Sequence, residues 1–424
     1  MTRKGDGSNP PSNQGDSGHA YSGEPVSPSE GLALLDNVQF IYELALARLE
    51  LLSFGVQFEI VDGFRDFKLH KAEDERELRR RLAYFKSING SETDYFRIIQ
   101  KNRTRSVNQY LTHWIYPYKG KFHPQMIRAL SNIIGLKRGE TVLDPFIGSG
   151  TTAVEAQLLG VNCVGVDTSP LCVLQSRVKT ESVAAIQRIR ETMNDILDAM
   201  RRSLFDRGAD ALREPIDSLP EGPVRNFYRM AMLVAISDQA RRKRDFSKSF
   251  LKNLERMLGS VEDQHAIAES LCLNLGEVDI LEGDARALEL ADCSIDGIIT
   301  SPPYSIALDY VENDAHSLEE LGCDVFQIRD RFVGLKGKGE ARIGLYNEDM
   351  RVCLDEMFRV LRPGKCAAIV VGDARYLGQE VGTTAFVTDH AKSIGFELLA
   401  NVNKIIFGLY SVMQKENILI FRKR

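Results

Sequence analysis

The segment Ser301-Pro302-Pro303-Tyr304 follows an apolar run over 295–300 and combines residue types that could hold the edge of a planar base. Two consecutive prolines fix the backbone torsion φ and remove two N–H donors, which leaves carbonyl acceptors at the end of a predicted strand. The Ser301 hydroxyl and the Pro302 carbonyl can accept hydrogen bonds from an exocyclic amino group, while the Tyr304 ring can stack on the base. The tetrapeptide therefore favours chemistry on an amino group over its alternative, a rigid turn.

A second motif ends the apolar run 141–143 and leads into a predicted helix over 153–159; it reads Asp144-Pro145-Phe146-Ile147-Gly148-Ser149-Gly150-Thr151. A strand, a glycine-bearing turn and a helix form the first unit of a nucleotide-binding α/β sheet, in which the glycines let the backbone approach a ligand. The third glycine of a dinucleotide fingerprint is missing, because position 153 is Ala. Asp144 also suits a positively charged ligand better than a pyrophosphate, so the motif favours a sulfonium amino acid over NAD.

A second predicted strand, residues 162–167, ends in Asp167 about twenty residues after the glycines. Nucleotide-binding α/β folds place at this point the acid that accepts both ribose hydroxyls. A lone acid after a strand is usually a loop residue, but its register with the glycine turn favours the ribose interpretation for Asp167.

Together, the two motifs resemble those of the S-adenosylmethionine-dependent amino-methyltransferases, specifically the N4-cytosine and N6-adenine DNA methyltransferases. The likeness covers about residues 110–180 and 275–424. It implies a cofactor site formed by Asp144, Phe146, Gly148, Gly150 and Thr151 on the methionine side, Asp167 at the ribose and Asp284 at the adenine edge. It further implies that the segment 112–126 closes over the methionine end of the cofactor.

Ser301 at the head of the tetrapeptide distinguishes two branches of this family. Members that act on adenine mostly carry Asp or Asn at this position, whereas members that act on cytosine N4 usually carry Ser. The resemblance thus implies direct methyl transfer to the N4 amino group of a flipped cytosine, with Ser301, Pro302, Pro303 and Tyr304 as the catalytic segment. The C5-cytosine route needs a cysteine nucleophile after a proline, and no Pro-Cys dipeptide occurs.

The composition is that of a soluble enzyme with one large α/β core and one or two accessory pieces, because the 424 residues are 43% hydrophobic. The seven cysteines are scattered without a C-x-x-C pair, so we expect neither a metal site nor a disulfide framework. No signal peptide and no apolar run long enough for a membrane span are found, which favours a cytoplasmic protein without membrane contact.

The expected fold is an α/β, Rossmann-like methyltransferase sheet of seven strands with one antiparallel strand. Residues 1–30 are rich in Gly, Ser, Pro, Asn and Asp and are expected to form a disordered tail. Helical patterns over 32–52 and 71–82 predict a helical N-terminal extension, residues 31–108. The catalytic domain then comprises 109–180 and 276–424, interrupted by a helical insertion, 181–275, with a possible role in nucleic-acid recognition.

Two regions are candidates for contacting the target. The insertion contains the basic cluster Arg241-Arg242-Lys243-Arg244, which in a chain of net charge -5 is either a phosphate contact or a solvated helix end. The region 319–349 mixes charges with glycines, among them Gly334, Gly337, Gly339 and Gly344, and is predicted to be a mobile loop near the base pocket. The insertion precedes the positions at which the family places its target-recognition domain.

The sequence therefore favours one function and leaves several alternatives open. The favoured one is DNA N4-cytosine methylation, with nucleic acid, expected to be DNA, as the partner and a restriction nuclease as a possible companion. The alternatives are methylation of a base amino group in tRNA or rRNA and N6-adenine methylation of DNA. A nucleic-acid-binding protein on a degenerate methyltransferase fold is a further alternative, although both halves of the site are intact.

Overall fold

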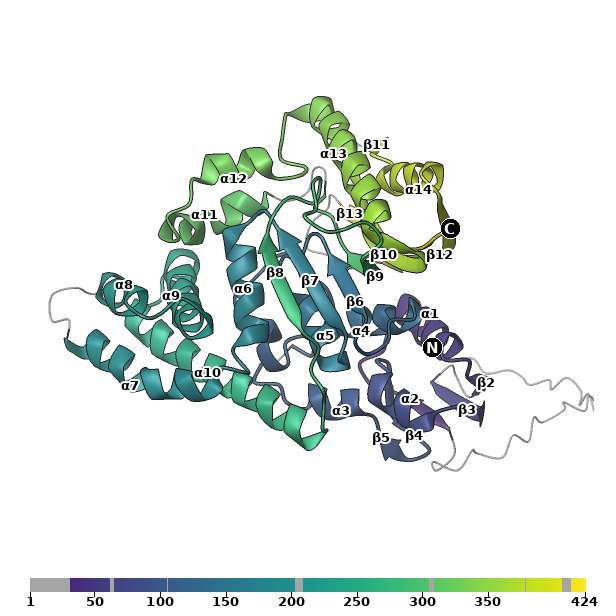
Figure 1. Ribbon diagram of the computed structural model, residues 1–424, viewed down its shortest axis with the longest axis horizontal. Coiled ribbons are helices and arrows are strands. Elements are labelled where there is room, and N and C mark those ends of the chain that lie inside the picture. The colour runs from purple at the N-terminus through teal and green to yellow at the C-terminus, as the bar shows by residue number, and fades with distance from the viewer. Residues whose placement is uncertain are drawn as a thin grey trace, which may run out of the picture.

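The computed structural model describes residues 31–61, 65–104, 106–202, 209–304, 309–377, 379–405 and 413–424. The expected tail, residues 1–30, lies outside the described residues. Three parts follow one another across the molecule (Figure 1): a helical layer at one end, a central sheet with helices on its faces, and an N-terminal unit beside the sheet.

The central sheet has, within the described ranges, seven strands in the order β12-β13-β10-β9-β6-β7-β8, and the two-residue strand β11 pairs with β10. Strand β13 runs antiparallel to both β10 and β12, whereas the pairs from β10 through β8 are parallel. The predicted methyltransferase sheet with one reversed strand is thus confirmed. The strands are β6 (Thr141–Asp144), β7 (Asn162–Asp167), β8 (Val278–Glu282), β9 (Ile295–Thr300), β10 (Leu361–Tyr376), β11 (Gln379–Glu380), β12 (Phe396–Ile405) and β13 (Met413–Lys423).

Burial on both faces explains why these segments form parallel strands. All six residues of β9 are buried, and Gly297 within it leaves no room for a side chain, because an added Cβ would lie 2.9 Å from the side chain of Leu136. The carboxyl ends of parallel strands meet at one edge of a sheet, so Asp144, Asp167 and Thr300 end up as neighbours. This edge carries the candidate functional residues.

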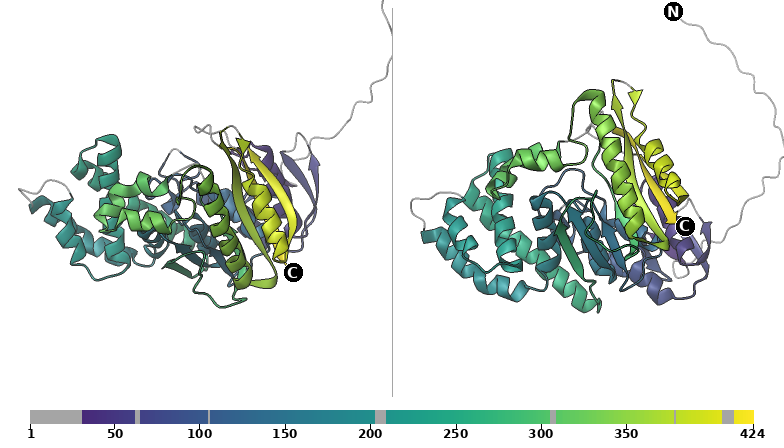
Figure 2. Two further views of the ribbon diagram at one scale, coloured as in Figure 1. Left: turned by 90° about the horizontal axis from the view of Figure 1, so that it is seen from above. Right: turned by 45° about the horizontal axis from the view of Figure 1, so that its top comes forward.

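Helices pack on both faces of the sheet (Figure 2). Glycines flank the helix that follows the Asp144–Thr151 motif: Gly150 before its start has a φ of 76°, and Gly160 after its end has a φ of 71°. The helices of the catalytic domain are η1 (Leu111–Trp114), α4 (Pro124–Ile133), α5 (Thr151–Leu159), α6 (Pro170–Glu181), α11 (Tyr310–Glu320), α12 (Val325–Arg331), α13 (Gly339–Val360) and α14 (Thr383–Ser393).

The N-terminal unit corrects the expectation of an all-helical extension. It contains an antiparallel sheet of five short strands in the order β2-β3-β1-β4-β5. Its strands are so short that their pattern is weak, and pairing partners distant in sequence, such as Leu32 with Phe67 and Ile88, create the sheet. The elements are β1 (Leu32–Leu34), α1 (Ile41–Ser53), β2 (Gln57–Val61), β3 (Asp66–Lys71), α2 (Glu75–Arg81), β4 (Phe85–Ile88), β5 (Ser91–Glu92) and α3 (Asp94–Ile99).

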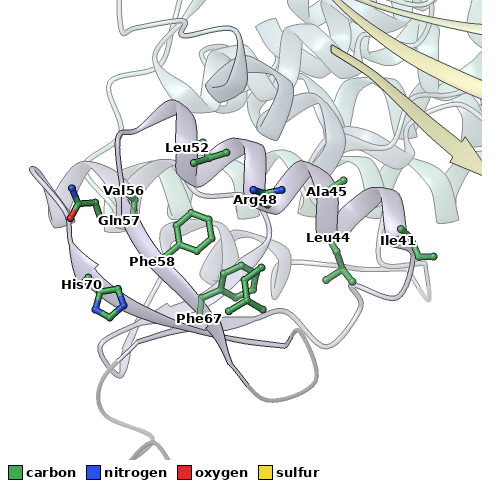
Figure 3. A pocket seen from close by; sticks show the side chains of 11 residues that line it. Ile41, Leu44, Ala45, Arg48, Leu52, Val56, Gln57, Phe58, Phe67 and His70 are labelled. Atoms are coloured by element: carbon green, nitrogen blue, oxygen red, sulfur yellow. The ribbon is translucent and has the colours of Figure 1, made fainter. Parts of the chain in front are cut away.

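A groove of about 830 Å³ opens between α1 and the strands β2 and β3 (Figure 3). Phe58 and Phe67 form much of its apolar lining, together with Leu44 and Leu52. The groove lacks the clustered polar groups that mark the carboxyl edge of the central sheet, so its size alone does not identify it as the site of chemistry.

The insertion is helical, as predicted, and lies at the end of the molecule beyond β8 and α6 (Figure 1). Its helices pack around Phe227, Tyr228 and Phe250 in a hydrophobic core that they share with α6, α11 and α12 of the catalytic domain. They are α7 (Ile186–Arg202), α8 (Asp210–Asp217), α9 (Pro223–Arg242) and α10 (Phe246–Ser270).

The region 319–349, expected to be a mobile loop, is mostly helical, and that expectation was wrong. It contains α12 and the first half of α13, and the connection between them is limited to 332–338. Its glycines misled the prediction, because Gly322 ends one helix and Gly344 lies inside another.

The described residues contain neither a membrane-spanning helix nor a candidate metal cluster. No helix there combines the length and the apolar character that a membrane crossing requires. The same part of the chain holds no group of three or more His, Cys, Asp or Glu side chains placed to bind a metal ion.

Candidate functional site

Asp144 joins the glycine turn to the tetrapeptide strand. Its Oδ1 accepts hydrogen bonds from Thr300 Oγ1 at 2.7 Å and the Phe146 amide at 3.2 Å, and its Oδ2 accepts one from Thr152 Oγ1 at 2.6 Å. The side chain is 1% exposed, and burial raises its pKa to about 6 against the opposing effect of the hydroxyl donors. The residue directly before Ser301 is therefore fixed to the turn that begins at Asp144.

Gly148 and Gly150 adopt backbone conformations that other residues rarely adopt, with φ of 48° and 76°. A Cβ at Gly150 would lie 2.9 Å from the Cα of Ser176 in α6, and a Cβ at Gly148 would lie 3.3 Å from the Tyr118 ring. The buried Lys179 ammonium also stabilises the turn, because it donates a hydrogen bond to the Ser149 carbonyl at 2.6 Å. Only glycines allow this close packing of the turn.

Asp167 at the end of β7 faces the same turn. Its Oδ2 accepts a hydrogen bond from the Gly148 amide at 2.9 Å, and its Oδ1 accepts one from the Ser169 amide at 2.9 Å. Burial raises its pKa to about 6, although both amides favour the charged form. Each carboxylate oxygen retains a lone pair, so Asp167 can accept two further hydrogen bonds.

A small pocket joins the predicted cofactor residues to the tetrapeptide. It has a volume of about 30 Å³, and its lining includes Pro145, Phe146, Asp167, Thr168, Gly283, Asp284, Ala285, Pro303, Phe332 and Val333. This volume is far below the roughly 300 Å³ at which ligand pockets begin. Phe332 and Val333, from the connection between α12 and α13, occupy the side that faces the predicted residues.

Asp284 is already engaged by Arg286. The guanidinium donates from Nε to Oδ1 at 2.9 Å and from Nη2 to Oδ2 at 2.6 Å, and the Arg286 amide also donates to Oδ1 at 2.9 Å. The pKa of Asp284 is lowered, because this pairing outweighs the effect of burial. One lone pair on Oδ2 stays available, so the carboxylate can accept one hydrogen bond from a ligand.

The tetrapeptide presents its residues unequally. Ser301 and Pro303 are half-buried, whereas Pro302 is buried and Tyr304 is 9% exposed. The Tyr304 hydroxyl donates to Glu416 Oε1 on β13, and Lys404 on β12 donates to the other oxygen of Glu416 at 2.5 Å. Burial and the adjacent Glu416 carboxylate raise the pKa of Tyr304 well above its usual value. Tyr304 thus links the segment that follows β9 to strand β13.

Three aromatic rings from separate elements stack at this edge. Tyr310, the first residue of α11, lies 6.1 Å from Tyr118 and 6.1 Å from Phe332, measured between ring centroids, and both pairs are close to parallel. Tyr118 covers Gly148, and Phe332 lines the small pocket. Tyr310 therefore sits between the glycine turn and the pocket, and it is only half-buried.

The basic cluster is largely paired. Arg241 donates to Asp314 Oδ1 and to the Asn313 carbonyl, each at 2.6 Å, while Arg242 and Arg244 both pair with Asp238. Arg241 thereby ties the end of α9 to α11, and these two helices lie side by side (Figure 1). Much of the charge of the cluster is thus compensated within the protein.

Segments of the sequence are similar to known proteins. Residues 68–176 match the DNA methylase family of the N6/N4 type. A type II methyltransferase of Methanocaldococcus jannaschii, M.MjaII, is 33% identical over 135 residues, which cover 31% of this chain and 23% of that protein. Over these segments the chain is similar to the N6/N4 DNA methylases. S-adenosylmethionine is the cofactor of such methyltransferases, and nucleic acid is their substrate.

Two further proteins are similar to shorter segments of the chain. The type II methyltransferase M.BsoBI of Geobacillus stearothermophilus is 36% identical over 89 residues, which cover 19% of this chain and 17% of that protein. A tRNA (guanine(10)-N2)-dimethyltransferase of Methanothermobacter thermautotrophicus is 36% identical over 70 residues, which cover 16% of this chain and 20% of that protein. The matched segments thus span about a fifth of each of these relatives.

Similar solved structures include TrmN from Thermus thermophilus, with a TM-score of 0.34 and 16% identity over 76% of this chain and 54% of that one. A putative DNA modification methylase, also from Thermus thermophilus, has a TM-score of 0.21 and 24% identity over 33% of this chain and 52% of that one. At such scores these likenesses support no inference about this chain.

The predicted site residues divide into two groups. Phe146, Asp167 and Asp284 share one pocket with Pro303, and Asp144, Gly148, Gly150 and Thr151 form or brace the adjoining turn. The basic cluster, Arg241 to Arg244, lies apart from the pocket. Sequence analysis included Tyr118 in the segment 112–126 but missed Arg286, Tyr310 and Phe332; of these three, Tyr310 had a local signal, because it follows the tetrapeptide by six residues.

Proposed function

We propose that this protein is a site-specific DNA methyltransferase that methylates the exocyclic N4 amino group of cytosine, with S-adenosylmethionine as the methyl donor. The observation that carries the proposal is that Phe146, Asp167, Asp284 and Pro303 line one and the same pocket. The hydrogen bond from Thr300 to Asp144 fixes the tetrapeptide strand relative to the glycine turn. Positioning of two reactants in this way accounts for much of the rate in direct group transfer.

The residues fit the chemistry of the cofactor. Asp167 retains two acceptor positions for ribose hydroxyls, and Asp284, oriented by Arg286, retains one for the adenine amino group. The turn at Gly148 and Gly150 accommodates the methionine portion, because no side chain projects from it. When bound, S-adenosylmethionine supplies an electrophilic sulfonium methyl group, and the pocket must widen to admit it.

The tetrapeptide acts on the target amino group. The N4 lone pair of cytosine is delocalised into the ring and must be localised before it can attack a methyl group. Ser301 Oγ and the Pro302 carbonyl each accept one N–H of the amino group, which draws the nitrogen toward tetrahedral geometry. Ser301 is accessible for this role, since it is half-buried rather than enclosed.

Tyr310 replaces Tyr304 as our candidate for stacking on the flipped base. Tyr304 is nearly enclosed and its hydroxyl is committed to Glu416, so its ring has little free face. Tyr310 is half-buried, with Tyr118 stacked on one neighbouring side and Phe332 on another. Phe332 must move away as the pocket widens, and the base then takes its place on the Tyr310 ring. Tyr304 then holds the strand exit in place, and Tyr310 supports the base after flipping.

RNA methylation is the second candidate function, and a relative of this chain favours it. The tRNA dimethyltransferase of Methanothermobacter thermautotrophicus is as similar in its matched segment as M.BsoBI, at 36% identity each. Ser301 favours cytosine N4 over adenine N6 in DNA, and N6-adenine methylation is the remaining alternative. A companion nuclease stays part of the DNA hypothesis.

The test uses S-adenosylmethionine with an isotopically labelled methyl group, offered with genomic DNA and, separately, with total RNA. The products are digested to nucleosides and analysed by mass spectrometry. We expect label in N4-methyldeoxycytidine. Label confined to N6-methyldeoxyadenosine or to a ribonucleoside would contradict the cytosine or the DNA assignment, respectively.

Two substitutions test the residue roles. Ser301→Ala should lower turnover about 100-fold, as expected for loss of one preorganised hydrogen bond, with the cofactor affinity unchanged. Asp167→Ala should weaken cofactor binding measured by calorimetry. Ser294→Ala, just before the other end of β9, is the matched control and should leave both quantities unchanged. Wild-type turnover in Ser301→Ala would refute the catalytic assignment.

A further inference from the structure

A groove of about 630 Å³ lies between the N-terminal unit and the end of α10. Its lining comprises Arg76, Arg79, Arg80, Ser91, Glu92, Asp94, Arg97, Ser270, Leu271 and Cys272. The segment 270–272 precedes β8, which enters the central sheet at Val278 and leaves it at Glu282. The groove therefore lies toward the amino ends of the parallel strands, away from the edge that carries the tetrapeptide (Figure 1).

The groove has an excess of positive charge. Four arginines face two carboxylates, Glu92 and Asp94, in a protein whose net charge is -5. Asp94 is half-buried among the arginines, and Arg80, Arg97 and Arg79 all act to lower its pKa, although burial outweighs them and raises it. These two acids, together with Glu75 that pairs with Arg79, compensate at most three of the four arginines, so an excess of positive charge remains.

The hydrogen bonding of the four arginines is incomplete. Arg79 pairs with Glu75 at 2.6 Å, and Arg80 donates to the Cys272 carbonyl at 3.3 Å. Arg76 and Arg97 are exposed and form no ion pair within the part of the chain that the structure describes. The Nε of Arg79 is buried without a hydrogen-bond partner among the described residues. This differs from the cluster at 241–244, whose arginines pair with Asp314 and Asp238.

Phosphate groups fit this set of donors. A guanidinium offers two parallel N–H groups to the oxygens of a phosphate, and arginine is the residue best suited to such contacts. The groove is open enough for a chain of linked phosphates, since its volume lies well within the range of known ligand sites. Its apolar surface is small, so a hydrophobic ligand would gain little here.

We propose that this arginine groove, defined by Arg76, Arg79, Arg80 and Arg97, binds the phosphodiester backbone of the nucleic-acid substrate at a distance from the methylated base. The inference rests on the proposed function, because it assigns a second contact surface for the same substrate. Contacts to phosphates fix the register of a protein on nucleic acid and supply affinity that does not depend on sequence. The groove thus makes the N-terminal unit part of the substrate-binding surface.

Salt dependence of binding tests the proposal directly. Each phosphate neutralised by a cation contributes about 0.9 to the slope of log affinity against log salt for duplex DNA and about 0.7 for a single strand. The Arg76→Gln/Arg97→Gln variant of the full chain should therefore lose about 1.8 from the slope with labelled duplex DNA, or about 1.4 with single-stranded RNA. Fluorescence anisotropy over a range of KCl concentrations gives the slopes.

The matched control removes two charges elsewhere. Lys392→Gln/Arg424→Gln changes the exposed end of α14 and the last residue of the chain and should leave the slope unchanged. Cofactor affinity of both double variants should equal that of the wild type, which establishes that they are folded. The single variant Arg76→Gln should show half the change in slope.

The outcomes separate this proposal from the proposed function. If the wild type methylates nucleic acid but Arg76→Gln/Arg97→Gln keeps its slope, the groove assignment is overturned and the methyltransferase assignment stands. An equal change in the control variant would also overturn it, because the effect would then be one of net charge. If the wild type transfers no methyl group to DNA or RNA and binds neither, both proposals fail.

Discussion

At the scale of single residues, the site depends on which side chains are already committed to protein partners. Asp144 accepts three hydrogen bonds that hold the turn to the tetrapeptide strand, and the Tyr304 hydroxyl donates its hydrogen bond to Glu416. Ser301 and Tyr310 are more accessible, and both lie at the exit of β9 or just beyond it. The residues that we propose to meet the substrate are therefore supported by neighbours that are committed to protein partners.

Tyr310→Ala tests the stacking role. Stacking of a base on an aromatic ring contributes about 1 to 3 kcal/mol, so kcat/KM for the nucleic acid should fall about 10- to 100-fold. Tyr310→Phe should retain most of the activity, because the ring rather than the hydroxyl acts. Phe326→Ala, which removes an 81% exposed ring from α12, is the control for nonspecific effects. Undiminished kcat/KM in Tyr310→Ala would rule out the role.

At the scale of elements, the connection from α12 to α13 closes the cofactor pocket. Phe332 and Val333 line the pocket, and glycines with positive φ follow at Gly334, Gly337 and Gly339. Arg286 reaches from Asp284 to the Arg331 carbonyl at 2.9 Å and to Asp349 at 2.6 Å, so one guanidinium joins both ends of the connection to the predicted adenine-edge acid. This arrangement suggests that the connection opens when the cofactor enters.

Gly334→Ala should favour the open arrangement. Gly334 has a φ of 84°, and an added Cβ would lie 3.2 Å from the Tyr304 carbonyl, so the closed conformation is penalised by about 1 to 2 kcal/mol. Stopped-flow measurements should show association and dissociation of S-adenosylmethionine accelerated about 5- to 30-fold. Gly344→Ala, where a Cβ meets nothing within 4 Å, is the matched control. Equal rates in both variants would contradict the opening.

At the scale of the whole molecule, the N-terminal unit is docked firmly on the catalytic domain. Glu50 of α1 accepts hydrogen bonds from Asn132 of α4 at 2.6 Å and from the Ala83 amide at 2.9 Å. Arg81 extends this network to the Leu136 carbonyl at 2.7 Å. These buried contacts hold the arginine groove in a fixed position relative to the site of chemistry, so both can engage one rigid substrate.

The pKa of Glu50 makes this docking dependent on pH. Burial raises the pKa to about 7 from 4.5, so between these pH values the folded protein keeps a proton that the unfolded chain loses. Stability from this group is complete below pH 4.5 and is lost as pH rises through about 7, by about 3 kcal/mol in total.

Glu50→Gln mimics the protonated side chain and removes this loss. The Tm of the variant relative to the wild type should rise by about 5 °C between pH 5 and pH 8. Glu73→Gln, at an exposed position before α2, should show no such trend. A pH-independent difference for Glu50→Gln would show that Glu50 does not titrate in this range.

What the sequence determined by itself was the local chemistry and the class of the central sheet. The strand, the glycine turn and the helix that starts at Thr151 are contiguous in the chain, and Ser301 directly follows its own strand, so short-range geometry fixes them. The helices of the insertion were equally predictable, because their apolar residues recur at helical spacing.

Only the tertiary structure decided the sheet of the N-terminal unit, the helices within 319–349, and the partners of the predicted residues. The short strands of the unit are stabilised by pairing over long sequence distances, which local patterns do not encode. The ring stack joins Tyr118, Tyr310 and Phe332 from three separate segments, and the arginine groove joins α2 and α3 to the end of α10. Such sites arise from packing between elements, so no single stretch of the chain carries their signature.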